Sequence, residues 1–349
     1  MRDYNNFNKG RRPCVLIDIG HPAHVHLFRN FVTHLQMKGV PFLITSRKKD
    51  LTTALLDHYG LEHITISRQA ETIGGQFLEF IVRTFRILRL HYRHRFTLAI
   101  GTSVSIGYLT LFTFGKVRSY NFCEDDDSAV PLQVALSYPF STRIVNPDCI
   151  RFSRWKSKRI LLPTYHELAY LHPDHFTPDP NVPKKYSLEP GKYIILRLSS
   201  LKAHHDRNEK GIASGLLEKI RKSAGNFKII ESLELADTHS IAPWEMHDVL
   251  AYARLLITDS QTMTAEAALL GTPSIRISTF KNRLSYLNEI ESRIPNALSF
   301  DPGSTRQILS AIYDCLNSDP NRHAKHHVDE WIRSEKTDLA RWMRKNFIE

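Results

Sequence analysis

Short apolar runs alternate with amphipathic stretches along the first half of the chain. The run 14–19 is almost continuously apolar, as expected of a strand buried on both faces of a parallel sheet. The stretch 25–37 repeats apolar residues at helical spacing and ends before Gly39. The same pattern predicts strands at 40–45, 63–66, 98–100, 118–122 and 144–146, and helices at 51–59, 76–94 and 105–114. This alternation predicts a doubly wound parallel sheet.

The alternation stops at a proline-rich stretch and then begins again. Five prolines between 163 and 185 disfavour regular structure and indicate a connection between domains. The second half predicts strands at 193–198, 228–231 and 255–258, and helices at 212–222, 246–253, 304–317 and 326–347. We therefore expect an α/β fold with two Rossmann-like domains, at 1–165 and 191–325, a linker at 166–190 and a C-terminal helix at 326–349. Two such doubly wound parallel-sheet domains facing each other would place the active site in an interdomain cleft.

The composition is that of a globular protein with acidic partners. Of the 349 residues, 42% are hydrophobic and 24% are charged, which argues against a disordered or fibrous chain. The net charge of +11 favours nucleotides, anionic lipids or nucleic acid. Because no aromatic-plus-basic RNA motif is present, we expect no nucleic acid. The four cysteines form no C-x-x-C pair, which favours a reducing compartment over a zinc site or disulfides.

Three stretches bear on membranes. Residues 1–13 are polar and basic, so no secretory signal is expected, and we place the protein in the cytoplasm. Small polar residues interrupt the uncharged stretch 98–114, which favours a strand and a packed helix over a membrane span. The helix 76–94 interleaves arginines with apolar residues. It is either a core helix with a solvated basic face or a peripheral contact with anionic lipid at the inner face of the membrane. Its basic residues include Arg83, Arg86, Arg89 and Arg93.

The segment 255–275 has the features of a phosphate-binding turn. An apolar run ends in small polar residues, a short Ala/Leu-rich helix follows, and Gly271 stops that helix. The start of this helix would present three free backbone N–H groups to an anion such as a diphosphate. These groups belong to Gln261, Thr262 and Met263. Glu266 would accept hydrogen bonds from the vicinal hydroxyls of a ribose; the alternative is an ordinary βαβ unit with a solvated glutamate.

A second candidate for phosphate contact is Arg197, which ends the strand 193–198. A basic loop follows it, with Lys202, His204 and His205. The planar guanidinium of Arg197 would clamp a diphosphate, although a surface arginine after a strand is equally common. No G-x-G-x-x-G follows the first strand and no G-x-x-x-x-G-K-[ST] occurs, so neither a dinucleotide dehydrogenase nor a P-loop enzyme is expected.

Three histidines crowd the loop after the first strand, at His21, His24 and His26. A histidine at a helix N-terminus stays neutral near pH 7 and can accept a proton from an attacking hydroxyl, which makes His24 a candidate general base. Capping or packing is the alternative, and it is stronger for His21 and His26. No carboxylate or cysteine at ligand spacing accompanies the three, so we expect no metal.

Two further stretches have simpler interpretations. Residues 124–127 are all acidic and follow the strand 118–122; we interpret them as a solvated loop, with metal binding as the alternative. Gly74 and Gly75 open the basic helix 76–94. They would either let the backbone approach an acceptor or a pyrophosphate closely, or simply turn the chain.

Three strings of the sequence resemble an uncharacterised family known as domain of unknown function 354. They are DIGHPAHVH at 18–26, YHELAYLHP at 165–173 and SQTMTAEAALLGTP at 260–273. The resemblance covers nearly the whole chain. This family is similar in turn to the GT-B superfamily, which contains nucleotide-sugar glycosyltransferases and the non-hydrolysing UDP-N-acetylglucosamine 2-epimerases. The resemblance implies an acceptor-side N-terminal domain and a nucleotide-sugar-binding C-terminal domain.

Two comparisons bear on the choice between transfer and epimerisation. The epimerases carry an Asp-Ser-Gly-Gly motif that leads to a ribose-binding glutamate, which Asp259, Ser260 and Glu266 resemble in type and spacing. They also carry an aspartate after one first-domain strand and a glutamate at the end of the next. Here these positions hold Thr102 and Glu124, so an acid/base group that elimination requires is replaced. The cell-wall N-acetylglucosaminyltransferase that acts on lipid-linked muropeptide has a His-Val pair similar to the one that begins at His24.

These features favour a metal-independent glycosyltransferase in cell-surface polysaccharide or glycolipid synthesis. We expect a UDP-sugar donor, a glycan or lipid-linked acceptor and no cofactor. His24 would deprotonate the acceptor hydroxyl. The donor would be held by Arg197, Ser260, Gln261, Thr262 and Glu266. A non-hydrolysing UDP-sugar 2-epimerase and a non-catalytic sugar-nucleotide binder are the alternatives.

Overall fold

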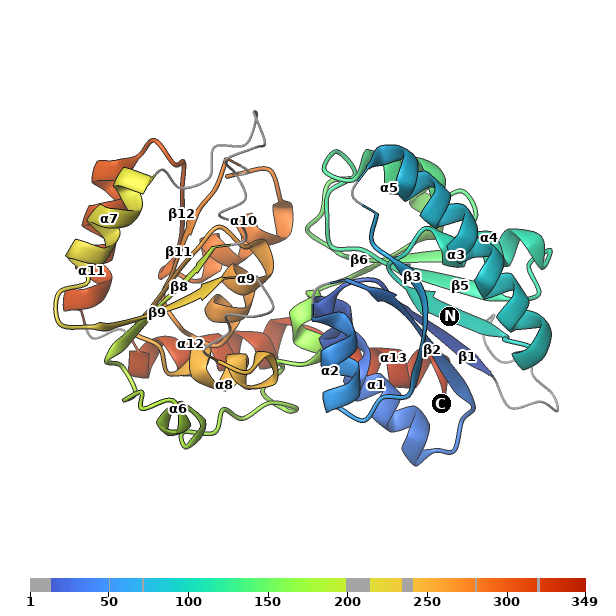
Figure 1. Cartoon of the computed structure of the whole chain (residues 1–349), viewed down its shortest axis with the longest axis horizontal. Coiled ribbons are helices and arrows are strands. Elements are labelled where there is room, and N and C mark those ends of the chain that lie inside the picture. The colour runs from blue at the N-terminus through green and yellow to red at the C-terminus, as the bar shows by residue number, and fades with distance from the viewer. Residues whose placement is uncertain are drawn as a thin grey trace. The chain divides into compact units, whose positions relative to one another are not determined.

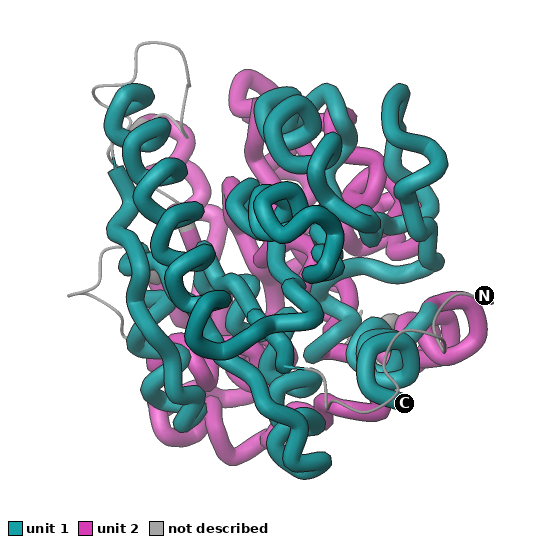
Figure 2. The backbone as a smooth tube through the Cα atoms, turned by 90° about the vertical axis from the view of Figure 1, so that its right-hand side faces the viewer, with its two compact units in different colours: residues 1–170, 337–349 teal, residues 171–336 magenta. Residues whose placement is uncertain are grey.

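The computed structural model describes residues 14–49, 51–70, 72–198, 214–233, 241–279, 281–318 and 321–349. The chain divides into two compact units, which Figure 2 colours separately. The N-terminal unit comprises residues 1–170 together with 337–349, and the C-terminal unit comprises 171–336. Each unit has its own parallel sheet, as the alternating pattern predicts; the sheets have seven and five strands respectively.

The sheet of the N-terminal unit has the strand order β3-β2-β1-β4-β5-β6-β7. Its strands are β1 (Val15–Ile19), β2 (Phe42–Lys48), β3 (His63–Arg68), β4 (Leu98–Gly101), β5 (Arg118–Phe122), β6 (Arg143–Pro147) and β7 (Arg159–Leu162). The order reverses between β1 and β4, where Val15 pairs with Phe42 on one side and with Leu98 on the other. Such a reversal leaves a crevice at the carboxyl ends of the two strands. The apolar pattern does not predict β7, a partly exposed strand at the edge of the sheet.

Helices cover both faces of this sheet (Figure 1). They are α1 (Pro22–Met37), α2 (Thr52–His58), α3 (Ile73–His94), α4 (Ser105–Phe112), α5 (Pro131–Leu136) and α13 (Leu339–Phe347), with 3₁₀ turns η1 (Lys156–Lys158) and η2 (His166–Ala169). On one face α3 and α4 bury Ile87 and Ile106 against Leu16 of β1. On the other face α1 packs against α13, where the rings of Phe31 and Phe347 lie 5.9 Å apart.

The C-terminal part of the chain differs from its prediction. Instead of a single helix at 326–347, α12 (Asn321–Glu335) ends before α13 begins. The Asp338 side chain caps α13 by accepting the Arg341 N–H at 2.9 Å, and the Thr337 N–H donates to Pro163 O at 2.7 Å. These bonds take the place of the backbone hydrogen bonds of a continuous helix. The helix therefore ends here, and α13 belongs to the N-terminal unit. The predicted linker 166–190 is likewise divided, because η2 belongs to the N-terminal unit and α6 (Val182–Lys185) to the C-terminal unit.

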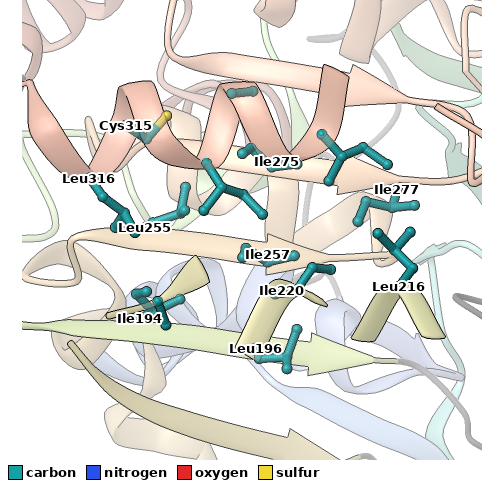
Figure 3. Packing of buried hydrophobic residues seen from close by; sticks show 14 of the residues in the cluster. Ile194, Leu196, Leu216, Ile220, Leu255, Ile257, Ile275, Ile277, Cys315 and Leu316 are labelled. Atoms are coloured by element: carbon teal, nitrogen blue, oxygen red, sulfur yellow. The ribbon is translucent and has the colours of Figure 1, made fainter. Parts of the chain in front are cut away.

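The sheet of the C-terminal unit has the order β12-β11-β10-β8-β9. Its strands are β8 (Tyr193–Leu198), β9 (Lys228–Leu233), β10 (Leu255–Thr258), β11 (Ser274–Ile277) and β12 (Ala297–Phe300). The helices α7 (Ser214–Ser223) and α11 (Thr305–Asn317) cover one face, where Ile220 packs with Ile257 and Ile275 in the core of Figure 3. The unit also contains η4 (Pro243–Glu245), α8 (Met246–Ala251), α9 (Gln261–Leu269) and α10 (Ser285–Arg293). The apolar pattern predicts neither α10 nor β12.

Two local predictions about the chain can be compared directly with the elements. The stretch 98–114 forms β4 and α4, and none of the described helices is long and apolar enough to cross a bilayer. Gly74 and Gly75 lie in the first turn of α3, where the Gly75 N–H donates to the Thr72 hydroxyl at 3.1 Å. A Cβ at Gly75 would lie 2.9 Å from the Ala70 Cβ, so the glycine serves the packing of this helix start.

Candidate functional site

A cavity of about 660 Å³ opens at the strand reversal of the N-terminal unit. The loops that follow β1, β4 and β5 contribute to its wall, together with α3 and η2. We call it the N-terminal cavity. Its ionisable and polar lining includes His21, His24, Thr102, Glu124, Asp125 and His166. A concave pocket at a topological switch point is the usual ligand site of an open parallel sheet.

His24 lies in the first turn of α1 and meets the hydroxyl of Thr102. The Thr102 Oγ1 is 2.9 Å from His24 Nδ1 and 3.2 Å from Nε2. Burial holds the pKa of His24 well below its usual value, and His21 and His166 lower it further. Burial, rather than the helix N-terminus invoked from the sequence, is therefore the main reason that this imidazole is neutral. A neutral imidazole in a ligand-sized cavity can accept a proton.

The neighbouring histidines have structural contacts. His21 caps α1, because its Nδ1 accepts the Ala23 N–H at 3.2 Å. Burial lowers the pKa of His21 to about 4, with help from Lys49 and Arg47. His26 is buried against the rings of Tyr59 and Tyr170. Within the described residues, His21, His24 and His26 do not bring three ligand atoms together.

The acidic run 124–127 is not a solvated loop, so this interpretation of the sequence was wrong. Asp126 is 3% exposed and accepts a backbone N–H from the loop before η1. Asp127 pairs with the buried guanidinium of Arg159 at 2.5 Å. Glu124 and Asp125 line the N-terminal cavity. The run follows the carboxyl end of a buried strand, and this position brings its side chains into the interior.

Asp125 and His166 are candidate functional residues that sequence reasoning missed. Burial raises the pKa of Asp125 to about 6, with Glu124 adding to the shift. The Nδ1 of His166 is 3.5 Å from Glu124 Oε2, which also accepts the His166 backbone N–H at 3.2 Å. Burial lowers the pKa of His166 to about 4, although Asp125 opposes this. Such perturbed groups in one cavity are typical of acid/base sites. Two features of the sequence could have indicated these residues: the run of carboxylates at 124–127 follows a strand, and His166 lies in the family string 165–173.

A buried ion pair supports the wall of this cavity. The Asp18 carboxylate, at the end of β1, accepts hydrogen bonds from Arg83 of α3, from Ser103 and, at 2.6 Å, from Thr45. Arg83 is only 5% exposed, so its predicted place on a solvated basic face was wrong. Its guanidinium is held inside because the carboxylate at the end of β1 compensates its charge. A Cβ at Gly101 would lie 2.7 Å from Asp18 O, so β4 needs a glycine there.

The C-terminal unit contains the predicted strand-turn-helix from β10 through α9 to β11. Ser260 caps α9, and its hydroxyl accepts the Met263 N–H at 3.4 Å. The expectation of three free N–H groups is therefore wrong for Met263. No described residue accepts from the backbone N–H of Gln261 or Thr262, which leaves two donors at this helix start. Donors in this position suit an anion.

Glu266 is fixed within the C-terminal unit rather than solvated. It is 5% exposed, and its Oε1 lies 2.9 Å from Nε2 of His247 on α8. The alternative that Glu266 is merely solvated is therefore wrong. The ribose contact of Glu266 stays a prediction. Sequence reasoning missed His247, which carries no motif of its own.

Arg197 lies at the same sheet edge as the start of α9. It pairs in register with Thr258 of β10, two residues before Ser260. The structure thus brings Arg197 and residues 260–262 to the carboxyl ends of neighbouring strands of one unit, whereas His24 belongs to the other. The basic residues Lys202, His204 and His205 lie outside the described residues.

Residues 14–289 match the family described as Protein of unknown function (DUF354). The chain belongs to this family. The resemblance inferred from the three strings is therefore confirmed. No curated protein sequence matches the chain significantly.

Solved structures share the fold at low sequence identity. The UDP-GlcNAc 2-epimerase from Methanocaldococcus jannaschii in complex with UDP-GlcNAc and UDP is 12% identical, with a TM-score of 0.62, covering 92% of this chain and 98% of its own. The enzyme of that name from Neisseria meningitidis, bound to UDP-GlcNAc, is 9% identical, with a TM-score of 0.63 and coverage of 96% and 99%. The spinosyn forosaminyltransferase SpnP is 11% identical, with a TM-score of 0.63 and coverage of 96% and 98%. The chain therefore has the predicted GT-B fold, shared by glycosyltransferases and epimerases.

Proposed function

We propose that the protein is a nucleotide-sugar-dependent glycosyltransferase with a UDP-sugar donor. In this proposal the N-terminal cavity receives the acceptor hydroxyl. One observation carries it: the neutral imidazole of His24 lines a switch-point cavity and is hydrogen-bonded to Thr102. In the GT-B epimerases that the chain resembles, the position of Thr102 holds an aspartate. A threonine hydroxyl orients the imidazole but takes up no proton at neutral pH.

The reaction would proceed by direct displacement at the anomeric carbon of the donor. A ring nitrogen of His24 accepts the proton of the acceptor hydroxyl as its oxygen forms the new glycosidic bond. The bond from the anomeric carbon to the diphosphate oxygen breaks, and UDP leaves with the electron pair. The imidazolium formed at His24 then returns its proton to water. Burial disfavours this cation, so the low pKa of His24 also promotes the return of the proton.

Donor binding is assigned to the C-terminal unit. The backbone N–H groups of Gln261 and Thr262, with the Ser260 cap and the guanidinium of Arg197, supply donors for a diphosphate. In this arrangement positive helix and guanidinium charge stabilises the leaving UDP without a metal ion. Glu266 would hold the ribose, with its carboxylate oriented by His247.

One observation favours the epimerase alternative. Asp125 and Glu124 line the same cavity as His24, and the raised pKa of Asp125, about 6, suits proton transfer. Replacement of the aspartate by Thr102 therefore does not remove every carboxylate from the site. An epimerase would need no acceptor, and this difference separates the two reactions.

The test uses the purified full-length chain without an acceptor. A panel of UDP-sugars is first screened by thermal shift, since a ligand that binds the native state raises the Tm. The stabilising sugar is then incubated with the protein and followed by NMR for its 2-epimer. We expect stabilisation without epimerisation, and transfer when glycan or lipid-linked acceptors are added. Transfer that survives EDTA would support metal independence. Interconversion of the 2-epimers would overturn the transferase proposal, and stabilisation by no nucleotide sugar would overturn both reactions.

A further inference from the structure

The outward face of α3 is apolar, although it is exposed to solvent. Five of its side chains are between 46% and 88% exposed: Ile73, Phe77, Leu78, Ile81 and Phe85. The face toward the sheet is occupied instead by Arg83, Thr84 and Ile87, which are buried. Single exposed apolar side chains are common, but a contiguous group on one helix marks an interaction surface.

This group extends onto α4 through a series of aromatic contacts. The ring of Phe80 lies 6.4 Å from that of Phe77 and 4.9 Å from that of Tyr108 on α4. The Tyr108 ring lies 6.4 Å from that of Phe112, which is 55% exposed. Phe114 follows and is 93% exposed. We call the exposed apolar side chains of α3 together with Phe112 and Phe114 the apolar face. Figure 1 shows α3 and α4 on the same side of the N-terminal sheet.

Among the described residues, positive charge predominates beside the α3–α4 part of the apolar face. Between Phe80 and Cys123 the sequence contains seven Lys and Arg residues and no Asp or Glu. At the C-terminal end of α3, Arg89 and Arg93 are exposed, as is Lys116 after α4. The one carboxylate on α3, Glu79, is held by Arg47 at 2.6 Å. The surface therefore complements an anionic, partly apolar partner.

The apolar face also reaches the mouth of the N-terminal cavity. Ile73 and Phe77 belong both to this face and to the cavity lining. Leu132 and Leu136 of α5, which are 75% and 41% exposed, line the same mouth. A molecule that covers the face therefore borders the entrance through which a substrate reaches His24.

We propose that the apolar face docks on an anionic lipid bilayer. Phe85 and Phe114 enter the boundary between head groups and acyl chains, while Arg89 and Arg93 contact lipid phosphates. A second copy of this chain fits the face less well, because self-association would bring the same arginines against each other. Docking would present the cavity mouth to an acceptor whose chain stays in the bilayer; this last step rests on the proposed function.

The test is co-sedimentation of the full chain with vesicles, without donor or acceptor. Vesicles of phosphatidylglycerol are compared with vesicles of phosphatidylcholine at low and high salt. We expect binding to phosphatidylglycerol, at least tenfold weaker binding to phosphatidylcholine, and loss of binding as salt screens the arginines. Because no turnover is measured, this proposal can fail while the transferase proposal stands, and the reverse also holds.

Two variants remove the two properties separately. The charge variant is Arg89→Glu with Arg93→Glu, since Arg86 bonds to the Ile66 carbonyl at 2.6 Å and is left intact. The apolar variant is Phe85→Gln with Phe114→Asn, because asparagine tolerates the positive φ of 52° at residue 114. We expect the charge variant to bind phosphatidylglycerol at least tenfold more weakly, since each basic residue near such a surface contributes about fivefold. We expect a loss of at least about tenfold in the apolar variant as well, because each phenylalanine that leaves water on docking contributes about tenfold or more.

Matched controls change the same properties at other exposed positions. They are Lys219→Glu with Arg341→Glu for charge, and Met37→Gln with Tyr313→Gln for apolar area. These controls should bind as the unchanged chain does, and all variants should keep its Tm. Equal binding to both lipids, or equal weakening by variants and controls, would overturn the proposal. So would a dimer in light scattering that only the apolar variant dissociates, because the face would then join two chains.

Discussion

The carboxylate of Glu266 and the imidazole of His247 form a buried pair, with Oε1 and Nε2 2.9 Å apart. The two side chains are 7% and 5% exposed and come from consecutive helices, α9 and α8. A buried carboxylate held in this way has little rotational freedom, so any hydrogen bonds it makes to a ribose are pre-organised. This relationship is the basis of the first prediction.

Glu266→Gln should weaken UDP binding by about 1.5–3 kcal/mol, because an amide replaces a charged acceptor. The variant keeps the shape of the side chain and leaves His247 with a partner. Isothermal titration calorimetry measures the affinity. Glu231→Gln, at an exposed position paired with Arg221, is the matched control and should change nothing. Unchanged UDP affinity in Glu266→Gln would remove Glu266 from the donor site.

His24→Ala should lower kcat by about 10²–10⁴ with nearly unchanged donor affinity, because it removes the proposed base. Thr102→Val keeps the imidazole and deletes its hydroxyl partner, so it should reduce kcat by a smaller factor. Turnover is measured once an acceptor is identified, and UDP binding serves as the control in both variants. Full turnover in His24→Ala would place the base elsewhere, with Asp125 as the next candidate.

Acid should destabilise the N-terminal unit through two partly buried histidines, His21 and His166. The pKa values of His21 and His166 are each lowered to about 4 in the folded state, against about 6.5 in an unfolded chain. The unfolded state therefore binds more protons between these values, so stability is lost as the pH falls from about 6.5 through about 4. Urea unfolding at pH 7.5 and pH 5 measures this loss. We expect it to be smaller in His166→Asn, which cannot be protonated, and an equal loss in both proteins would contradict the prediction.

The ionisation of Asp125 should change stability with pH in the opposite direction. Its pKa is raised to about 6, so the folded state holds a proton that the unfolded state releases between about pH 4 and pH 6. Stability is therefore lost as the pH rises through this range. Asp125→Asn should stabilise the protein at pH 8 by up to about 3 kcal/mol and leave it unchanged below pH 4. The Tm at both pH values tests this, with Asp57→Asn at an exposed position as the control. A stabilisation that does not depend on pH would mean that ionisation is not its cause.

Local patterns in the sequence were sufficient for much of the fold. The spacing of apolar residues predicted six of the seven described strands of the N-terminal sheet. The small polar residues before Gln261 and the glycine at 271 predicted where α9 begins and ends. The elements that were missed are short or lie at an edge, such as β7 and β12. The break between α12 and α13 depends on the bond from Thr337 to Pro163, which are far apart in the sequence.

The candidate site was predicted less completely, because burial and charge compensation depend on residues that are distant in the sequence. His24, Arg197 and the residues around Ser260 could be chosen from motifs and from their places at strand ends. The raised pKa of Asp125 required the loop after β5 to be buried in the tertiary structure, and the burial of Arg83 required Asp18 of another element. The sequence alone determined the spacing of apolar residues in each segment, and therefore most of the secondary structure and the fold class. Only the tertiary structure decided which charges enter the interior, since the cost of burying an ion depends on the partner it meets there.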